Sequence, residues 1–248
     1  MTHQDFAVER FDVIDSTNTY LLDRARSGAP SGLVAVADHQ TAGRGRLDRR
    51  WESPAGAALL MSVLLRAPLE PAQLHLATAA VALSAVVAAE QACGLAPGLK
   101  WPNDLVIDDA KVAGILAEVD LSAPDGLPAI VVGIGVNLTW PGPPGVGGTC
   151  LLDATGVTVD RDEILGLLLA QLSGRLEQLA DDAGRRRLLA DLESRLVTIG
   201  RMVRVELADG ELVGRAVGLS GDGHLLVEGA DGIHEVSAGD VVHLRRAD

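Results

Sequence analysis

Cysteine and positive charge are both scarce in this chain of 248 residues. Its two cysteines, Cys93 and Cys150, stand in no metal-ligand spacing, and they indicate a reducing compartment without a disulfide framework. Lysine and arginine total 21 against 34 aspartates and glutamates, which gives a net charge of −13. General nucleic-acid binding depends on positive charge against phosphates, so we expect no nucleic-acid partner.

Long apolar runs and a signal sequence are missing too. The longest uncharged apolar run, from Leu76 to Ala89, is shorter than the ~20 residues that span a bilayer. The first residues, MTHQDFAVER, are polar and carry acidic side chains, unlike a signal peptide. We therefore expect a cytoplasmic protein with no membrane partner. Hydrophobic residues make up 48% of the chain, which is enough for one large domain, or for a large and a small one.

A cluster of arginines lies between residues 39 and 51, which read HQTAGRGRLDRRW. Arginine presents a planar fork of donors that fits a carboxylate or a phosphate, and glycine lets the backbone approach a ligand closely. Trp51 follows and is suited to stacking on a base or ring. We name residues 43–50 the Gly/Arg loop. It predicts a site for anionic, nucleotide-like ligands, with a solvated surface turn as the alternative.

Apolar periodicity predicts alternating strands and helices in the first 198 residues. A group of N-cap residues, Asp15 to Asn18, precedes the first helix. Pro71 is expected to begin a long helix that ends near Cys93 and is buried, because it is apolar on nearly all sides. Asp160 with Glu163 resembles a capping box before an amphipathic helix. The predicted strands are 11–14, 33–37, 56–65, a hairpin over 106–119, and 129–138.

Short alternating runs replace this pattern from Ile199 onward. Turns such as Gly221-Asp222-Gly223 and Asp231-Gly232 separate them, which predicts a small antiparallel barrel. We therefore place a domain boundary near Thr198, with domains at 1–198 and 199–248. The predicted strands of the barrel are 202–207, 212–219, 224–227, 233–236 and 241–244.

Polar residues stand at the breaks in the predicted strands. Asn103 and Asp104 follow a proline that ends a strand, and they are either site residues or plain turn residues. Lys111 begins the second strand of the hairpin, and Gly114 inside that strand marks close approach by a ligand or another backbone. Asn137 closes the strand 129–138, and its amide requires a partner, which is either backbone or a ligand.

Four segments, taken in order, resemble the biotin–protein ligase family: DSTN at 15–18, GRGR at 43–46, KWPNDL at 100–105 with KVAGIL at 111–116, and GIGVN at 133–137. KWPND followed by K-x-x-G is the most specific part. The resemblance implies an α+β fold, with a mixed-sheet catalytic domain of the class II synthetase-like biotin/lipoate ligase type plus a small C-terminal SH3-like β-barrel. It also implies the shorter class of the family, without the N-terminal domain that binds operator DNA.

The activity implied by this resemblance is ATP-dependent formation of biotinyl-5′-AMP and transfer of the biotinyl group to a lysine of a biotin carboxyl carrier domain. Mg²⁺ is expected with the ATP, and no metal ligand is assigned. The implied catalytic residues are Lys111, Arg44, Arg46 and Asp104. The implied biotin-binding residues are Ser16, Thr17, Asn18, Gln40, Arg44, Gly45, Arg46, Lys111, Gly114 and Gly133. The expected ATP-binding residues are Arg46, Arg49, Trp51, Asn103, Lys111 and Asn137, with a core tryptophan as the alternative for Trp51.

The Gly/Arg loop departs from the family pattern at one position. Members usually carry a glycine two residues after the second arginine, where this chain has Asp48. Aspartate tolerates left-handed backbone better than most residues, and Arg49 and Arg50 are candidate partners for its charge.

Three alternatives to an active biotin ligase stay open. Asp48 is the one hint of a degenerate ligase that binds biotin without turnover. A lipoate–protein ligase shares the chemistry, but GRGR and KWPND argue against it. The net charge of −13 and the few residues before the first strand argue against a biotin-responsive regulator or binding module.

Overall fold

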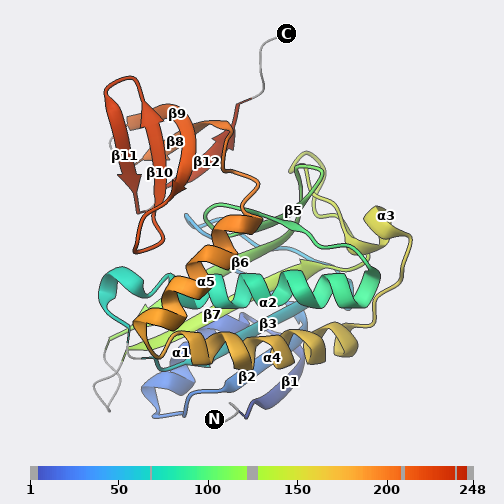
Figure 1. Cartoon of the computed structure of the whole chain (residues 1–248). Coiled ribbons are helices and arrows are strands. Elements are labelled where there is room, and N and C mark those ends of the chain that lie inside the picture. The colour runs from blue at the N-terminus through green and yellow to red at the C-terminus, as the bar shows by residue number, and fades with distance from the viewer. Residues whose placement is uncertain (1–4, 68, 122–127, 208–209, 238, 245–248) are drawn as a thin grey trace.

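The computed structural model describes residues 5–67, 69–121, 128–207, 210–237 and 239–244. Within these ranges the chain forms a seven-stranded sheet with helices on both faces and a separate five-stranded sheet near the C-terminus (Figure 1). A mixed sheet followed by a small antiparallel sheet confirms the fold class expected from the sequence.

The large sheet has the strand order β1-β2-β3-β7-β6-β5-β4. β1 and β2 run parallel, whereas the other neighbouring strands run antiparallel. β3 and β7 are buried along their whole length, which agrees with their nearly continuous apolar sequences. The strands are β1 Ala7–Ile14, β2 Leu33–Gln40, β3 Ala58–Leu65, β4 Gly98–Lys100, β5 Asp104–Ile107, β6 Ala110–Asp120 and β7 Ala129–Asn137.

Successive residues of the central strands face different layers of the fold. Ala35 and Leu64 pack in a small core beside α1, whereas Val34 and Leu65 belong to a larger core beside α2 and α4. Figure 1 shows α2, α4 and α5 together on one side of the large sheet. The helices are α1 Thr17–Arg26, α2 Leu76–Cys93, α3 Leu151–Thr155, α4 Arg161–Gln178 and α5 Asp182–Arg195, with a short 3₁₀ turn η1 at Pro71–Gln73.

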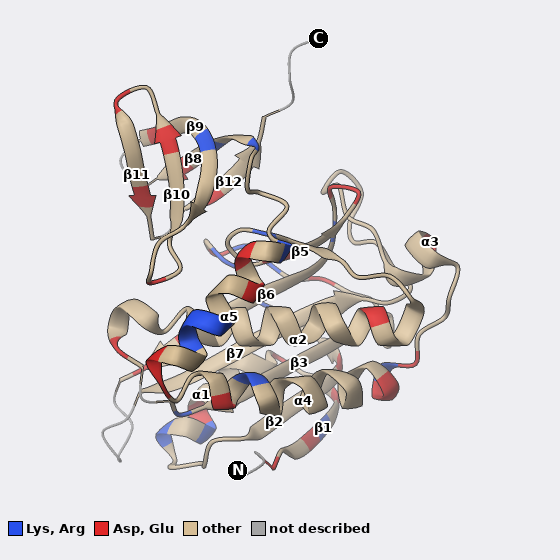
Figure 2. Cartoon of the chain, viewed as in Figure 1, with Lys and Arg blue, Asp and Glu red and all other residues tan. Residues whose placement is uncertain are grey.

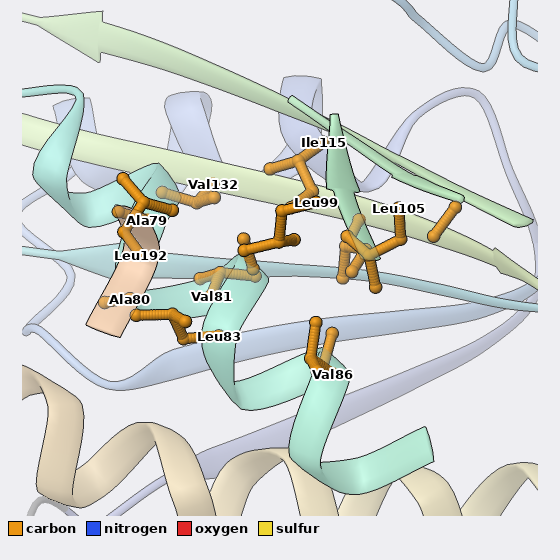
Figure 3. Close-up of a cluster of buried hydrophobic side chains, with 14 of the residues drawn as sticks. Ala79, Ala80, Val81, Leu83, Val86, Leu99, Leu105, Ile115, Val132 and Leu192 are labelled. Carbon is orange, nitrogen blue, oxygen red and sulfur yellow. The ribbon is translucent and has the colours of Figure 1, made fainter. Parts of the chain in front are cut away.

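α2 is the central helix of the larger core. By length and hydropathy the segment from Pro71 to Cys93 is suited to cross a membrane, but 67% of its most apolar window is buried inside the protein, as in a core helix. Figure 2 shows α2 without a basic residue, and Figure 3 shows Val81 next to Leu99 of the sheet and Val86 directed toward Leu105. The apolar sequence of α2 is therefore explained by packing.

The start of this helix differs from the sequence prediction. Pro71 begins only the 3₁₀ turn η1, and α2 begins at Leu76 after His75. The amides of Gln73 and Ala77 each donate to the carbonyl three residues earlier, so the chain is wound too tightly for an α-helix over this stretch. The end agrees with the prediction, because Gly94 takes a left-handed conformation with φ of 75° directly after Cys93.

The C-terminal sheet has the order β11-β10-β9-β8-β12, and each neighbouring pair is antiparallel. Its inward side chains, among them Val203, Ala216 and Val227, form one continuous core with α2 and α5. The strands are β8 Met202–Leu207, β9 Gly210–Leu219, β10 Leu225–Gly229, β11 Gly232–Val236 and β12 Asp240–His243, close to the predicted segments.

A histidine at the end of β12 joins this sheet to the rest of the chain. The Nδ1 and Nε2 atoms of His243 lie 3.2 Å from the Arg201 guanidinium and 3.2 Å from the Thr198 hydroxyl, respectively. Burial lowers the pKa of His243 from 6.5 to about 4, and the positive charges of Lys100 and Arg201 add to the effect, opposed by Asp109. His243 is therefore held neutral in the folded protein at neutral pH.

We expect Leu83→Ala to destabilise the protein strongly, because Leu83 is fully buried in α2. The expected loss is about 2–5 kcal/mol in the free energy of unfolding, measured by urea denaturation. Leu121→Ala is the matched control, since the Leu121 side chain is 75% exposed. The control is expected to change stability by less than about 0.5 kcal/mol, and equal losses in both variants would contradict the packing described for α2.

His243 also predicts a pH dependence of stability. The unfolded chain binds a proton on this side chain at higher pH than the folded protein, so the free energy of unfolding falls as pH decreases from 6.5 to about 4. The contribution of one such group approaches about 1.4 kcal/mol per pH unit. His243→Gln is expected to flatten the stability curve relative to wild type in this window, measured by urea denaturation at several pH values. Parallel curves for the two proteins would refute the prediction.

Candidate functional site

A cavity of about 640 Å³ opens on the face of the large sheet that carries α1. The end of β2, the Gly/Arg loop, the turn before β5, and parts of β6 and β7 contribute to its wall. The structure brings to this one cavity all the site residues named from the sequence: Ser16, Thr17, Asn18, Gln40, Arg44, Gly45, Arg46, Arg49, Trp51, Asn103, Asp104, Lys111, Gly114, Gly133 and Asn137.

Glycines on one face of β6 and β7 make room for side chains that line the cavity. Val131 packs beside α1, and Gly133 and Gly135 follow at alternate positions on the same face. A Cβ atom at Gly133 would lie 2.1 Å from Asn18 Oδ1, and one at Gly135 would lie 2.4 Å from the Trp51 ring. At both positions the glycine thus makes room for a side chain of the site itself.

A hydrogen-bond network lines the end of the cavity at the N-terminus of α1. Ser16 caps the helix by accepting from the Thr19 amide, and Gln40 Oε1 accepts from the Thr17 amide at 2.8 Å. The buried Ser62 hydroxyl lies 2.7 Å from Thr17 Oγ1 and 2.6 Å from Asn18 Oδ1. The group 15–18 therefore both caps the helix and faces the cavity, so the two interpretations of its sequence are compatible.

The Gly/Arg loop forms a tight hairpin. The Gly45 amide donates to the Arg49 carbonyl at 2.7 Å, and the Arg49 amide donates to the Arg46 carbonyl at 3.1 Å. The two residues of the turn, Leu47 and Asp48, have φ of 53° and 56°, as in a type I′ turn. Aspartate adopts this conformation more often than leucine does, so Asp48 fits the turn position at which the family usually has glycine.

The charge of Asp48 does not pair as the sequence suggested. Arg49 contacts Asp240 of β12 at 2.6 Å instead, and Arg50 donates to the Thr41 carbonyl. Neither arginine has its partner within the hairpin, because the loop folds back toward the C-terminal sheet and toward β2. Asp48 is exposed at the tip of the turn, where water solvates its carboxylate.

Several cations of the cavity pair with carboxylates, whereas Arg50 donates to the Thr41 carbonyl. Arg44 contacts Glu118 at 2.8 Å, Lys111 contacts Asp104 at 2.6 Å, and Arg46 lies 3.4 Å from Asp240. These contacts orient the cations before an anionic ligand binds.

Sequence reasoning missed Glu118, Ser62 and Asp240. The alternation of β6 carried a signal for Glu118, because it lies on the same strand face as Gly114. Asp240 had no such signal, since its partners lie more than 190 positions away in the chain.

Trp51 forms part of the cavity wall. Its ring lies against Gly114 and Gly135, and Lys111 Nζ lies 5.6 Å from the ring centroid, within the range of a cation–π interaction. The indole Nε1 atom is buried, and none of the residues that the structure describes is a hydrogen-bond partner for it. Asn137, in contrast, donates its amide to the Thr149 carbonyl at 2.9 Å, so a backbone partner satisfies it.

Comparison with known proteins identifies the chain's relatives. The model of the biotin/lipoate A/B protein ligase family matches residues 10–137, and that of the biotin protein ligase C-terminal domain matches residues 198–244. The Biotin--[acetyl-CoA-carboxylase] ligase of Mycobacterium tuberculosis is 41% identical over 93% of this chain and 86% of its own length. The enzyme of the same name from Paracoccus denitrificans is 34% identical over 92% of this chain and 96% of its own length.

A solved structure supports the same relationship. Biotin protein ligase from Aquifex aeolicus in complex with biotin and ATP has a TM-score of 0.81 and 31% identity, covering 96% of this chain and 98% of that one. Fold and cavity thus define a protein ligase with a small C-terminal barrel. The chain belongs to the biotin/lipoate A/B protein ligase family.

Gly135→Ala is expected to displace the Trp51 ring, because the added methyl group would lie 2.4 Å from it. We expect a loss of about 1–3 kcal/mol in the free energy of unfolding and an altered near-ultraviolet circular dichroism spectrum. Gly166→Ala in α4 is the control, since no atom lies within 4 Å of its added methyl group. The control is expected to keep the spectrum and to stabilise the helix by about 0.5–1 kcal/mol. An unchanged Gly135→Ala spectrum would show that the Trp51 ring does not lie against β7.

Proposed function

We propose that this chain is an ATP-dependent biotin–protein ligase that forms biotinyl-5′-AMP and transfers the biotinyl group to a lysine of a biotin carboxyl carrier domain. One observation carries the proposal: the Ser16–Asn18 turn, the Gly/Arg loop and Lys111 meet in one cavity. The chain is 41% identical to a Biotin--[acetyl-CoA-carboxylase] ligase over 93% of its length, which supports the same activity. The likeness to a structure with biotin and ATP supports the same two substrates.

Biotin is proposed to bind with its ring at the N-terminus of α1. Its ureido group has both donors and acceptors, and the hydroxyls and amides of this wall offer both. The acid end of biotin would then point toward the cations of the Gly/Arg loop and of β6. The proposed biotin-binding residues are Ser16, Thr17, Asn18, Gln40, Arg44, Gly45, Arg46, Lys111, Gly114 and Gly133, which all line the cavity.

The first reaction brings two anions together. A carboxylate oxygen of biotin attacks the α-phosphorus of ATP, the bond to the leaving pyrophosphate breaks, and biotinyl-5′-AMP remains. Arg44, Arg46 and Lys111 supply the positive charge that holds the reacting groups in line. Lys111, which contacts Asp104 at 2.6 Å, leaves this carboxylate as it turns to the phosphate. The proposed ATP-binding residues are Arg46, Arg49, Trp51, Asn103, Lys111 and Asn137, with Trp51 beside the adenine.

The second reaction uses the carboxylate that Lys111 has released. The amine of the acceptor lysine attacks the acyl carbon of the adenylate, the bond from that carbon to the phosphate oxygen breaks, and AMP leaves. Only the neutral amine is nucleophilic, so a base must orient it or take its proton. We assign that role to Asp104, which lines the cavity 2.6 Å from Lys111 Nζ.

Mg²⁺ is proposed to enter with ATP, held by phosphate oxygens and water. In the part of the chain that the structure describes, no group of three or more His, Cys, Asp or Glu side chains is arranged to hold a metal ion. No residue is therefore assigned to it.

We further propose that residues 1–198 form the catalytic domain and 199–248 the barrel. The barrel would assist ATP binding through Asp240, the partner of Arg46 and Arg49. A cytoplasmic location, with no nucleic-acid or membrane partner, is part of the same proposal, and the charge of −13 and the two free cysteines support it.

The test is incorporation of labelled biotin into a carrier domain in the presence of ATP and Mg²⁺. Wild type is expected to incorporate label only with ATP, and Lys111→Ala to lose about 100-fold or more of the rate, because a charge at the reacting phosphate is removed. Arg186→Ala, on the exposed face of α5, is the control and is expected to match wild type.

Two further results would change the conclusion. No incorporation by wild type, with biotin still bound, would leave a binding protein in which Asp48 disables turnover. Release of pyrophosphate with lipoate in place of biotin would identify a lipoate ligase.

A further inference from the structure

We propose that Glu118 is a positioning residue that holds Asn18 and Arg44 in the arrangement that binds biotin. The inference rests on the proposed function and adds a residue outside the cavity wall. Glu118 is on β6, and its side chain is only 19% exposed. It is not among the residues that line the cavity, whereas both of its partners are.

Two donors converge on the Glu118 carboxylate. Asn18 donates its Nδ2–H group to Oε2 at 2.9 Å, and Arg44 Nη2 lies 2.8 Å from Oε1. The two partners come from different parts of the site, one from the first turn of α1 and the other from the Gly/Arg loop. Glu118 therefore ties the wall proposed for the biotin ring to the loop proposed for its carboxylate.

The carboxylate also determines which way the Asn18 amide points. Asn18 Nδ2 faces Glu118 and the Leu116 carbonyl, which both only accept, while Oδ1 faces the Ser62 hydroxyl. A flipped amide would place its oxygen against two acceptors, so the observed orientation is strongly favoured. The Ser62 hydrogen is then committed to Asn18 Oδ1.

The direction of the Ser62 hydrogen bond also affects Thr17, whose hydroxyl contacts Ser62. Because Ser62 donates to Asn18, its oxygen accepts from Thr17 Oγ1 at 2.7 Å, a closer partner for that hydrogen than Gln40 Oε1 at 3.1 Å. Thr17 Oγ1 is left with free lone pairs at the cavity wall, where it is an acceptor. A ureido N–H of biotin requires such an acceptor. Glu118 thus sets the donor and acceptor pattern of the wall through two intervening hydroxyls.

A glutamine at this position cannot replace the carboxylate. Both partners donate, and a carboxylate accepts on both oxygens, whereas a glutamine amide presents an N–H group to one of them. Glu118→Gln keeps the size of the side chain and breaks one charge-assisted contact. Because both partners face biotin, the change is expected to act on biotin binding more than on ATP.

The experiment is calorimetric titration of biotin, together with pyrophosphate release to obtain the KM for ATP. Glu118→Gln is expected to raise the Kd for biotin about tenfold while the KM for ATP changes by less than about twofold. Glu9→Gln is the matched control. Glu9 also accepts from a side chain, that of Tyr20, and pairs with an arginine, Arg24, but it lies on β1 away from the cavity. The control is expected to bind biotin as wild type does.

A double mutant separates positioning from general destabilisation. In an Asn18→Ala background, Glu118→Gln is expected to raise the Kd for biotin by at most about threefold, because the contact of Glu118 with Asn18 is already lost and only that with Arg44 is left. Thermal unfolding of each variant shows that it is folded, and Glu118→Asp, which keeps the charge, is expected to bind more tightly than Glu118→Gln.

Two outcomes would overturn the inference. One is a Kd for biotin of Glu118→Gln within about twofold of wild type. The other is a Kd of the double variant raised by the full product of the factors measured for Asn18→Ala and Glu118→Gln alone. Failure of wild type to bind or incorporate biotin would instead refute the proposed function itself.

Discussion

Three glycines on one face of β6 and β7 leave room for Asn18, Trp51 and Lys111, whose side chains form the cavity wall beside α1. Gly114 lies opposite Gly135 in the register of the two strands, and Gly133 is two residues away. The other face of the same strands carries branched apolar residues packed in the larger core. One sheet therefore provides both a dense core and a hollow, and the polar ends of α1 and β2 lie at the edge of that hollow. Every feature of the proposed chemistry depends on this space being present.

Charge balance is the second constraint. An acidic protein concentrates arginines around one cavity and pairs three of them, Arg44, Arg46 and Arg49, with carboxylates. Paired side chains are held in place, so substrate anions meet oriented donors instead of mobile ones. Asp104 becomes available once a substrate phosphate takes Lys111 as its partner, which links the Lys111–Asp104 pair to both proposed reactions.

The C-terminal sheet is coupled to this arrangement through a few polar contacts and a shared core. Asp240 on β12 reaches Arg46 and Arg49, which are more than 190 positions earlier in the chain. The inward apolar residues of the C-terminal sheet pack in one core with those of α2 and α5, so this sheet is anchored to the side of the molecule opposite α1.

The sequence by itself determined the strands, the barrel segments, the family, and the set of residues that meet in the cavity, because each rests on local periodicity or on short motifs. It did not determine the tight 3₁₀ turn before α2, since Pro71 is equally suited to either kind of helix. Nor did it determine the partners of the arginines, since the two candidates for Asp48, Arg49 and Arg50, contact Asp240 and the Thr41 carbonyl instead. Glu118, Ser62 and Asp240 were found only in the tertiary structure. Their contacts join segments distant in the chain, and no local pattern specifies which carboxylate a flexible arginine will meet once the chain has folded.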